Sequence, residues 1–116
     1  MDRIYIRDLE VDCVIGINPE ERDILQKVII NVTLDCDLSP GTETDQIDDT
    51  LDYKGLKKAI YHMVKDSRFG LIEKLAQQVV DTCMRQERVQ RVVVSVDKPE
   101  ALRFARSVAV ELTRER

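Results

Sequence analysis

A strict alternation of apolar residues between positions 28 and 38 is the strongest constraint that this sequence places on its fold. Every second residue of that stretch (VIINVTLDCDL) is apolar, and most residues between them are polar or charged. A period of two predicts a β-strand with one face toward a core and the other face away from it. The rest of the chain must therefore supply a layer that covers the apolar face.

Three further segments have the pattern of strands, at about residues 3–15, 88–97 and 103–113. In the first, Ile4 and Ile6 share one parity and Leu9 begins the other, which predicts a β-bulge at Arg7–Asp8. The first two strands are expected to pair as an antiparallel hairpin around the turn GINPEERD. The strand expected over 103–113 places four apolar residues on one face: Phe104, Val108, Val110 and Leu112.

Two amphipathic helices are predicted between the second and third strands, over about residues 53–65 and 71–86. They follow a polar loop at 39–50, for which a short helical turn is the alternative. Their apolar residues recur at helical spacing, and Thr50 or Asp52 is placed to cap the first helix. The order ββααββ predicts an α+β fold, one four-stranded antiparallel sheet with two helices on one face. A length of 116 residues fits a single domain over 1–116.

Composition argues against several classes of protein. A net charge of −4 argues against nucleic acid as a partner, and no apolar run reaches the roughly 20 residues of a membrane span. The charged N-terminal stretch MDRIYIRDLE is unlike a signal peptide, so we expect a cytoplasmic protein. Cys13, Cys36 and Cys83 are expected to be buried thiols. With one histidine and no cysteine cluster, a zinc site has almost no ligands to draw on, so no metal is expected.

The uncovered face of the predicted sheet points to self-association. Ile29, Asn31 and Thr33 lie on it in the second strand, and the third strand adds another mixed set: Arg91, Val93 and Ser95. Such a face is neither core-like nor fully polar, and long strands leave open edges. Joining subunits edge to edge into a closed barrel would resolve both problems, so we expect a homo-oligomer.

Four side chains are candidates for chemistry, although each has a plainer structural interpretation. Glu73 in the first turn of the second helix complements the helix dipole, or it binds a flat edge that carries two N–H donors. Lys98 is a surface residue before a turn, or a partly desolvated amine that moves a proton. Tyr53 could cover a helix end, and Glu21 could be a solvated turn residue. None of the four alone defines a function.

Taken together, four motifs resemble the family of dihydroneopterin aldolase and dihydroneopterin triphosphate 2′-epimerase. They are IGINPEERDILQKVIINVTL with Glu21 and Gln26, IDDTLDYKGL with Tyr53, RFGLIEKLAQQVVD with Glu73, and VDKPEALRFARSVAVEL with Lys98. The resemblance covers essentially the whole chain. It implies the tunnelling fold, in which four subunits close a 16-stranded barrel and two rings stack into an octamer. A tetramer or octamer with active sites between subunits is therefore expected.

The resemblance also implies a site and a reaction. Glu73 would bind the 2-amino group and N3–H of a pterin, with the Ile72 and Leu51 backbones completing the slot. Lys98, Glu21 and a neighbouring subunit's Tyr53 would carry the proton transfers of a retro-aldol cleavage of 7,8-dihydroneopterin. The N5=C6 imine of that substrate accepts the electron pair, so no metal or cofactor is needed.

Two alternatives stay open at this point. One is the epimerase acting on the triphosphate, for which Arg103 and Arg106 are the candidate phosphate ligands. The other is a barrel subunit without catalytic activity that binds purine-like rings.

Overall fold

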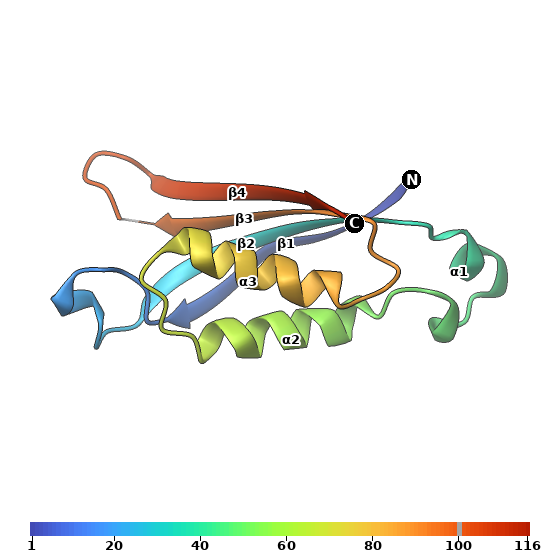
Figure 1. Cartoon of the computed structure of the whole chain (residues 1–116), viewed down its shortest axis with the longest axis horizontal. Helices are drawn as coiled ribbons and strands as arrows, with labels where there is room; N and C mark the ends of the chain where they lie inside the picture. The colour runs from blue at the N-terminus through green and yellow to red at the C-terminus, as the bar shows by residue number, and fades with distance from the viewer. Residues whose placement is uncertain (100) are drawn as a thin grey trace.

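The computed structural model describes residues 1–99 and 101–116, which form one four-stranded antiparallel sheet with helices packed on one face (Figure 1). The strands are β1 (Asp2–Cys13), β2 (Gln26–Cys36), β3 (Arg91–Pro99) and β4 (Ser107–Glu115), in the spatial order β1-β2-β3-β4. The covering helices are α2 (Tyr53–Lys65) and α3 (Ile72–Met84). The expected α+β fold and its ββααββ order are confirmed.

The core lies between the sheet and the two helices. Alternate residues of β2 and β3 are buried there, with one apolar face from each helix. The main members are Val28, Ile30, Val32, Leu34, Leu56, Ile60, Leu75, Val79, Val92, Val94 and Val96. Residues of β2 and β3 on the opposite face are mostly half-buried, which agrees with its mixed composition. No helix among the described residues is long and apolar enough to span a membrane.

The β1–β2 hairpin has the predicted irregularity. The pairing register shifts between Ile6 and Leu9, and Asp8 takes a positive φ of 54°. The Asn31 side chain stabilises this bulge by accepting the Asp8 N–H at 2.8 Å. The bulge therefore lets Ile4 and Ile6 pack toward the same core as Leu9, despite their opposite parity.

Several predicted boundaries need correction, and β4 needs the largest. It begins at Ser107 and not at residue 103, because Phe104 has a φ of 68° and is fully exposed in the preceding turn. The Phe104 side chain is thus not part of the apolar face of that strand. Strand β3 runs from Arg91 to Pro99, later than the expected 88–97, and α3 begins at Ile72.

The polar segment over 39–50 contains the short helical turn that the sequence allowed, as helix α1 (Ser39–Thr44), and also a 3₁₀ turn (Ile47–Asp49). Of the two expected caps of α2, Asp52 is the one used, since its carboxylate accepts the Gly55 N–H at 2.9 Å. Helix α1 and the start of α2 lie at one end of the molecule. The turns after β1, α2 and β3 lie at the opposite end (Figure 1).

Candidate active site

Lys98 stands at the end of a row of core-facing residues on β3. It follows Val92, Val94 and Val96 at a spacing of two, so its side chain lies on the helix-covered face just beyond the buried valines. There its Nζ donates to Oε2 of Glu21 at 2.7 Å. The two side chains are only 12% and 17% exposed, so this ion pair is largely shielded from water.

The Glu21 carboxylate is held by three donors. Besides Lys98, the Gln26 amide donates to Oε2 at 3.0 Å and the Asn18 N–H donates to Oε1 at 3.3 Å. These hydrogen bonds, led by that from Lys98, lower the pKa of Glu21 to about 2. Gln26 also donates to the Ile15 carbonyl at 2.8 Å, which ties the carboxylate to the end of the β1–β2 hairpin.

Gly16 makes room for this arrangement. It has a φ of 131°, and a Cβ there would overlap the Glu21 carboxylate. Glycine is the residue that accepts both the backbone conformation and the close approach. The glycine of the turn therefore has a direct role in placing the carboxylate.

Arg22 fastens the same turn to the segment that leads into α3. Its guanidinium donates to the carbonyls of Gly16 and Phe69, at 2.9 and 3.2 Å, and the Gly16 N–H also donates to the Phe69 carbonyl. Arg68 returns a hydrogen bond to the Arg22 carbonyl at 2.7 Å. Sequence reasoning did not single out Arg22, because its partners Arg68 and Phe69 lie more than 40 residues away and no local pattern indicates them.

The N-terminus of α3 follows directly after the segment that Arg22 holds. Ile72 is buried in the core and Glu73 is exposed in the first turn. No side chain caps the helix, so the N–H groups of its first turn point outward without an intrahelical partner. Among the described residues, no ion pair or side-chain hydrogen bond engages Glu73. Its carboxylate and the neighbouring N–H groups are therefore open to a ligand.

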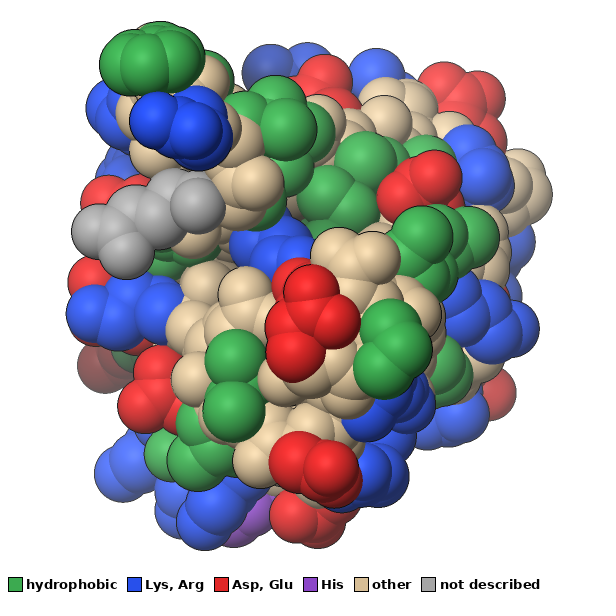
Figure 2. Space-filling view, turned by 90° about the vertical axis from the view of Figure 1, so that its left-hand side faces the viewer, with side chains coloured by type: hydrophobic (Ala, Val, Ile, Leu, Met, Phe, Trp, Pro, Cys, Tyr) green, Lys and Arg blue, Asp and Glu red, His purple; other side chains and the backbone are tan. Residues whose placement is uncertain are grey.

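Apolar side chains surround this end of the molecule. Figure 2 looks onto it and shows hydrophobic side chains gathered among acidic and basic ones. The exposed apolar residues belong to the turns after β1, α2 and β3: Ile17, Ile24, Leu25, Leu71, Leu102 and Phe104. A flat organic ligand held by Glu73 would thus find apolar surface close by.

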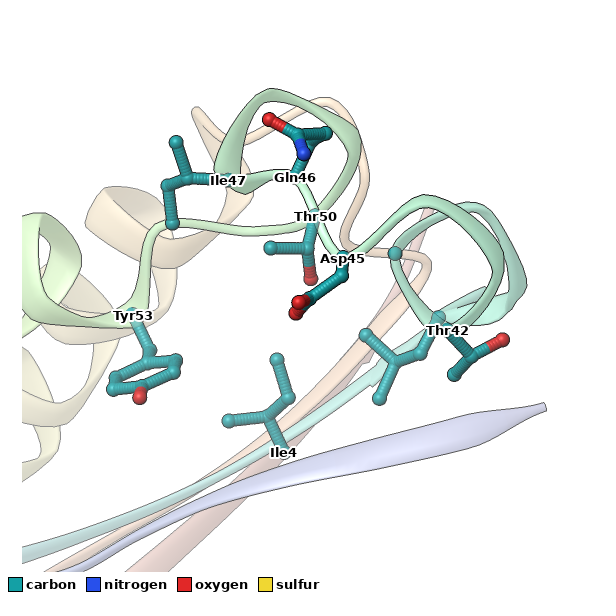
Figure 3. Close-up of a pocket in the computed structure, with 9 residues that line it drawn as sticks. Ile4, Thr42, Asp45, Gln46, Ile47, Thr50 and Tyr53 are labelled. Carbon is teal, nitrogen blue, oxygen red and sulfur yellow. The ribbon is translucent and has the colours of Figure 1, made fainter.

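Leu51 and Tyr53 lie at the other end of the same chain, where α2 begins (Figure 1). Tyr53 is 60% exposed, whereas the Leu51 side chain is buried in the core. Tyr53 and Ile4 face a hollow of about 520 Å³ beside α1 (Figure 3). A helix of 13 residues separates Tyr53 from the turn at Arg68, a length of roughly 20 Å.

One chain therefore pairs Lys98 with Glu21 and places Ile72 and Glu73 at the same end of the molecule, whereas Leu51 and Tyr53 lie at the other end. The described residues contain no group of three or more His, Cys, Asp or Glu side chains placed to hold a metal ion. At this end of the molecule, Glu73 can bind the edge of a ligand that carries N–H donors, and the Lys98–Glu21 pair can move a proton.

Comparison with known proteins identifies the family. The family model for dihydroneopterin aldolase (FolB) matches residues 4–113. The chain is 39% identical over 112 residues to a dihydroneopterin triphosphate 2′-epimerase of Pseudomonas aeruginosa, covering 97% of this chain and 91% of that protein. It is 32% identical over 114 residues to a dihydroneopterin aldolase of Haemophilus influenzae, covering 98% and 97%.

Comparison of the structure with solved structures identifies the same family. The crystal structure of Escherichia coli dihydroneopterin aldolase in complex with neopterin superposes with a TM-score of 0.94 at 27% identity, covering 98% of this chain and 99% of that one. The chain belongs to the dihydroneopterin aldolase family, whose members include enzymes named aldolase and enzymes named triphosphate epimerase.

Proposed function

We propose that this protein cleaves 7,8-dihydroneopterin by a metal-free retro-aldol reaction, releasing 6-hydroxymethyl-7,8-dihydropterin and glycolaldehyde. The observation that carries the proposal is the shielded Lys98–Glu21 ion pair beside the uncapped N-terminus of α3, where the Glu73 carboxylate is free. Neopterin bound to the related Escherichia coli aldolase supports a pterin as the ligand.

Glu73 binds the ring in this proposal. A pterin presents its 2-amino group and N3–H side by side, and one carboxylate accepts from both in a bidentate contact. Ile72 contributes backbone, since its side chain is buried in the core. The orphan N–H groups of the first turn of α3 are donors for the ring's acceptor atoms.

Lys98 and Glu21 carry the proton transfers. Removal of the 2′-hydroxyl proton lets the C1′–C2′ bond break, and its electron pair moves into the N5=C6 imine. The enamine that forms is protonated at N5, and it then takes up a proton at C1′ and releases the N5 proton, which restores the imine. The Lys98 ammonium is a proton donor of suitable type. Glu21 holds Lys98 Nζ at 2.7 Å and keeps it from turning toward solvent. Glycolaldehyde leaves as the second product.

Tyr53 and Leu51 complete the site from a second copy of the chain. Their distance from Lys98 within one chain supports this, since they could reach the substrate only across an interface. The open edges of the sheet provide that interface, and we propose a homo-oligomer, a tetramer or octamer built on a closed barrel.

A second candidate is the 2′-epimerase acting on the triphosphate, favoured by the 39% identity to the Pseudomonas aeruginosa protein of that name. The same bond cleavage followed by re-addition of the aldehyde would invert C2′. Arg103 and Arg106 are exposed in the turn before β4, at the end of the molecule that carries Lys98. Arg103 lies over the Phe104 ring at 5.4 Å. The N–H donors that would bind phosphate lie in the plane of its guanidinium, so a contact of one face with the ring does not block them.

Product analysis separates the two candidates. Dihydroneopterin and its triphosphate are each supplied to the purified protein, and glycolaldehyde and the C2′ epimer are measured at low and high salt. Aldolase function predicts glycolaldehyde from the unphosphorylated substrate with little salt dependence. A strong preference for the triphosphate that fades with salt and disappears in Arg103→Ala would establish the epimerase instead.

A further inference from the structure

Arg22 lies between the two groups of the candidate site that one chain holds at the same end of the molecule. It directly follows Glu21, whose carboxylate pairs with Lys98. Its guanidinium donates to the carbonyls of Arg68 and Phe69, in the segment that leads into α3. One half-buried side chain therefore connects the ion pair that would move the proton with the helix end that would bind the ring.

We propose that Arg22 is a positioning residue, which fixes the separation between the Lys98–Glu21 pair and Glu73 without contacting the substrate. The inference rests on the proposed function and adds the residue that sets its geometry. Glu73 would hold one edge of the pterin ring, whereas the hydroxyl that loses its proton lies on the side chain at the opposite end of the substrate. A displacement of about 1 Å between reacting groups can cost about a hundredfold in rate. The reaction therefore needs the two groups at a fixed separation.

Hydrogen bonds run in both directions between the turn after β1 and the segment before α3. Arg22 donates to the Phe69 carbonyl at 3.2 Å and to the Arg68 carbonyl. Arg68 donates back to the Arg22 carbonyl at 2.7 Å, and the Gly16 N–H donates to the Phe69 carbonyl at 3.2 Å. Arg22 also donates to the Gly16 carbonyl at 2.9 Å, within its own turn. Its guanidinium is thus the group on which both segments converge.

Arginine is the side chain that this arrangement requires. The three carbonyls, of Gly16, Arg68 and Phe69, accept from one guanidinium, whose N–H donors lie in a fixed planar fork. A lysine ammonium carries the same charge on a flexible stem and has no such fork. Among the described residues, no carboxylate forms an ion pair with Arg22. Its partners are backbone atoms, so it holds the paths of the two segments and not another side chain.

Arg116 provides a matched comparison. Its guanidinium also donates to three backbone carbonyls, those of Met84, Gln86 and Val89, at 2.6, 3.0 and 2.9 Å. These carbonyls lie at and beyond the C-terminal end of α3, opposite to the helix end that would bind the ring. Replacement of Arg116 therefore removes contacts of the same type without changing the connection that Arg22 makes.

Kinetics and binding measured on the same variants test this role. Arg22→Ala, Arg22→Lys and Arg116→Ala are compared with wild type in turnover of dihydroneopterin and its triphosphate, and in titration with neopterin. The inference predicts that kcat falls about a hundredfold in both Arg22 variants, since neither alanine nor lysine supplies the fork. The Kd for neopterin should stay within about threefold, because Glu73 is unchanged. Arg116→Ala should keep the kcat of wild type.

Three outcomes would overturn the inference. The first is a normal kcat in Arg22→Ala or a kcat restored in Arg22→Lys, because the fork would then not be needed. The second is a weakened Kd with normal kcat, which would place Arg22 in recognition. The third is an equal fall of kcat in Arg116→Ala, which would show that activity follows stability and not the position of the two segments.

Hydrogen exchange tests the connection without turnover. In Arg22→Ala and Arg22→Lys, the Gly16 N–H should exchange at least about tenfold faster relative to the Val94 N–H in the sheet, because a hydrogen bond to a charged group contributes at least that factor. In Arg116→Ala this ratio should not change, and an unchanged ratio in the Arg22 variants would overturn the connection. Equal turnover by wild type and Arg22→Ala refutes only this inference. Faster exchange in the Arg22 variants with no turnover by wild type refutes only the proposed reaction.

Discussion

The two ends of the molecule differ in how tightly their polar groups are held. At one end, hydrogen bonds join Lys98, Glu21 and Gln26, and the Lys98–Glu21 pair is shielded from water. Arg22 ties the turn after β1 to the segment before α3 at the same end. At the other end, Tyr53 stands exposed beside an open hollow, and its phenol forms no hydrogen bond to another described residue.

This contrast agrees with the proposed function, in which the two ends hold complementary halves of one active site. In that proposal, the end that carries Lys98 fixes groups that move a proton, which requires rigid placement. Tyr53, at the other end, would act only when another copy of the chain approaches. Variants of Lys98, Tyr53, Glu73 and Glu21 test this proposal, from the largest expected effect to the smallest.

Lys98→Ala should lower turnover about a thousandfold, because general acid–base catalysis contributes roughly 10²–10⁴ and Glu21 cannot replace the donor. Pterin affinity should stay within about tenfold, since the ring is held elsewhere. Glycolaldehyde release and a fluorescence titration with a pterin measure the two quantities. Lys57→Ala, at an exposed position on α2, is the control. Weakened binding with normal single-turnover chemistry would place Lys98 in recognition.

Mixing of inactive chains tests whether the two ends meet across an interface. Lys98→Ala and Tyr53→Ala chains are unfolded together at equal concentration, refolded and assayed. A site shared between copies combines an intact Lys98 with an intact Tyr53 in about one quarter of random pairings, so activity should return to about a quarter of wild type. Each variant refolded alone is the control. A mixture as inactive as its components would show that Tyr53 does not act across the interface.

Glu73→Ala should weaken pterin binding more than it slows bound substrate. Loss of a charge-assisted bidentate contact costs about 2–4 kcal/mol, or roughly thirtyfold to several hundredfold in Kd. Calorimetric titration with a pterin measures it. Glu87→Ala, exposed beyond the C-terminal end of α3, provides the comparison and should bind normally. An unchanged Kd for Glu73→Ala would mean that the ring binds elsewhere.

The lowered pKa of Glu21 predicts a small pH dependence of stability. The pKa is about 2 in the folded chain and about 4.3 when unfolded, so the Glu21 contribution is complete above about pH 4.3 and is lost as the pH falls toward 2. Glu21→Gln should therefore be less stable than wild type at pH 6, with the difference shrinking by pH 3. Urea unfolding at fixed protein concentration measures it, with the exposed Glu20→Gln as control. A difference in stability between Glu21→Gln and wild type that stays the same from pH 6 to pH 3 would contradict the predicted loss of the Glu21 contribution.

Local patterns in the sequence were sufficient for most of the fold. The alternation through β2, the parity change at Arg7–Asp8 and the helical spacing after Tyr53 all reflect contacts with one continuous core, so burial makes them visible in the chain itself. The predicted start of β4 was wrong because phenylalanine is common in strands, whereas Phe104 lies in a turn and has a positive φ. Composition does not reveal that backbone conformation.

For the site, the sequence by itself supplied residue types and, through resemblance, their roles. It placed Lys98 before a turn at the end of the third strand, and the structure shows that Lys98 continues the core-facing row at a spacing of two from Val96. Only the tertiary structure decided that Glu21 meets Lys98, that Arg22 joins two distant turns, and that Tyr53 lies far from both. These contacts span 46 to 77 residues and depend on how whole elements pack, which no local pattern records.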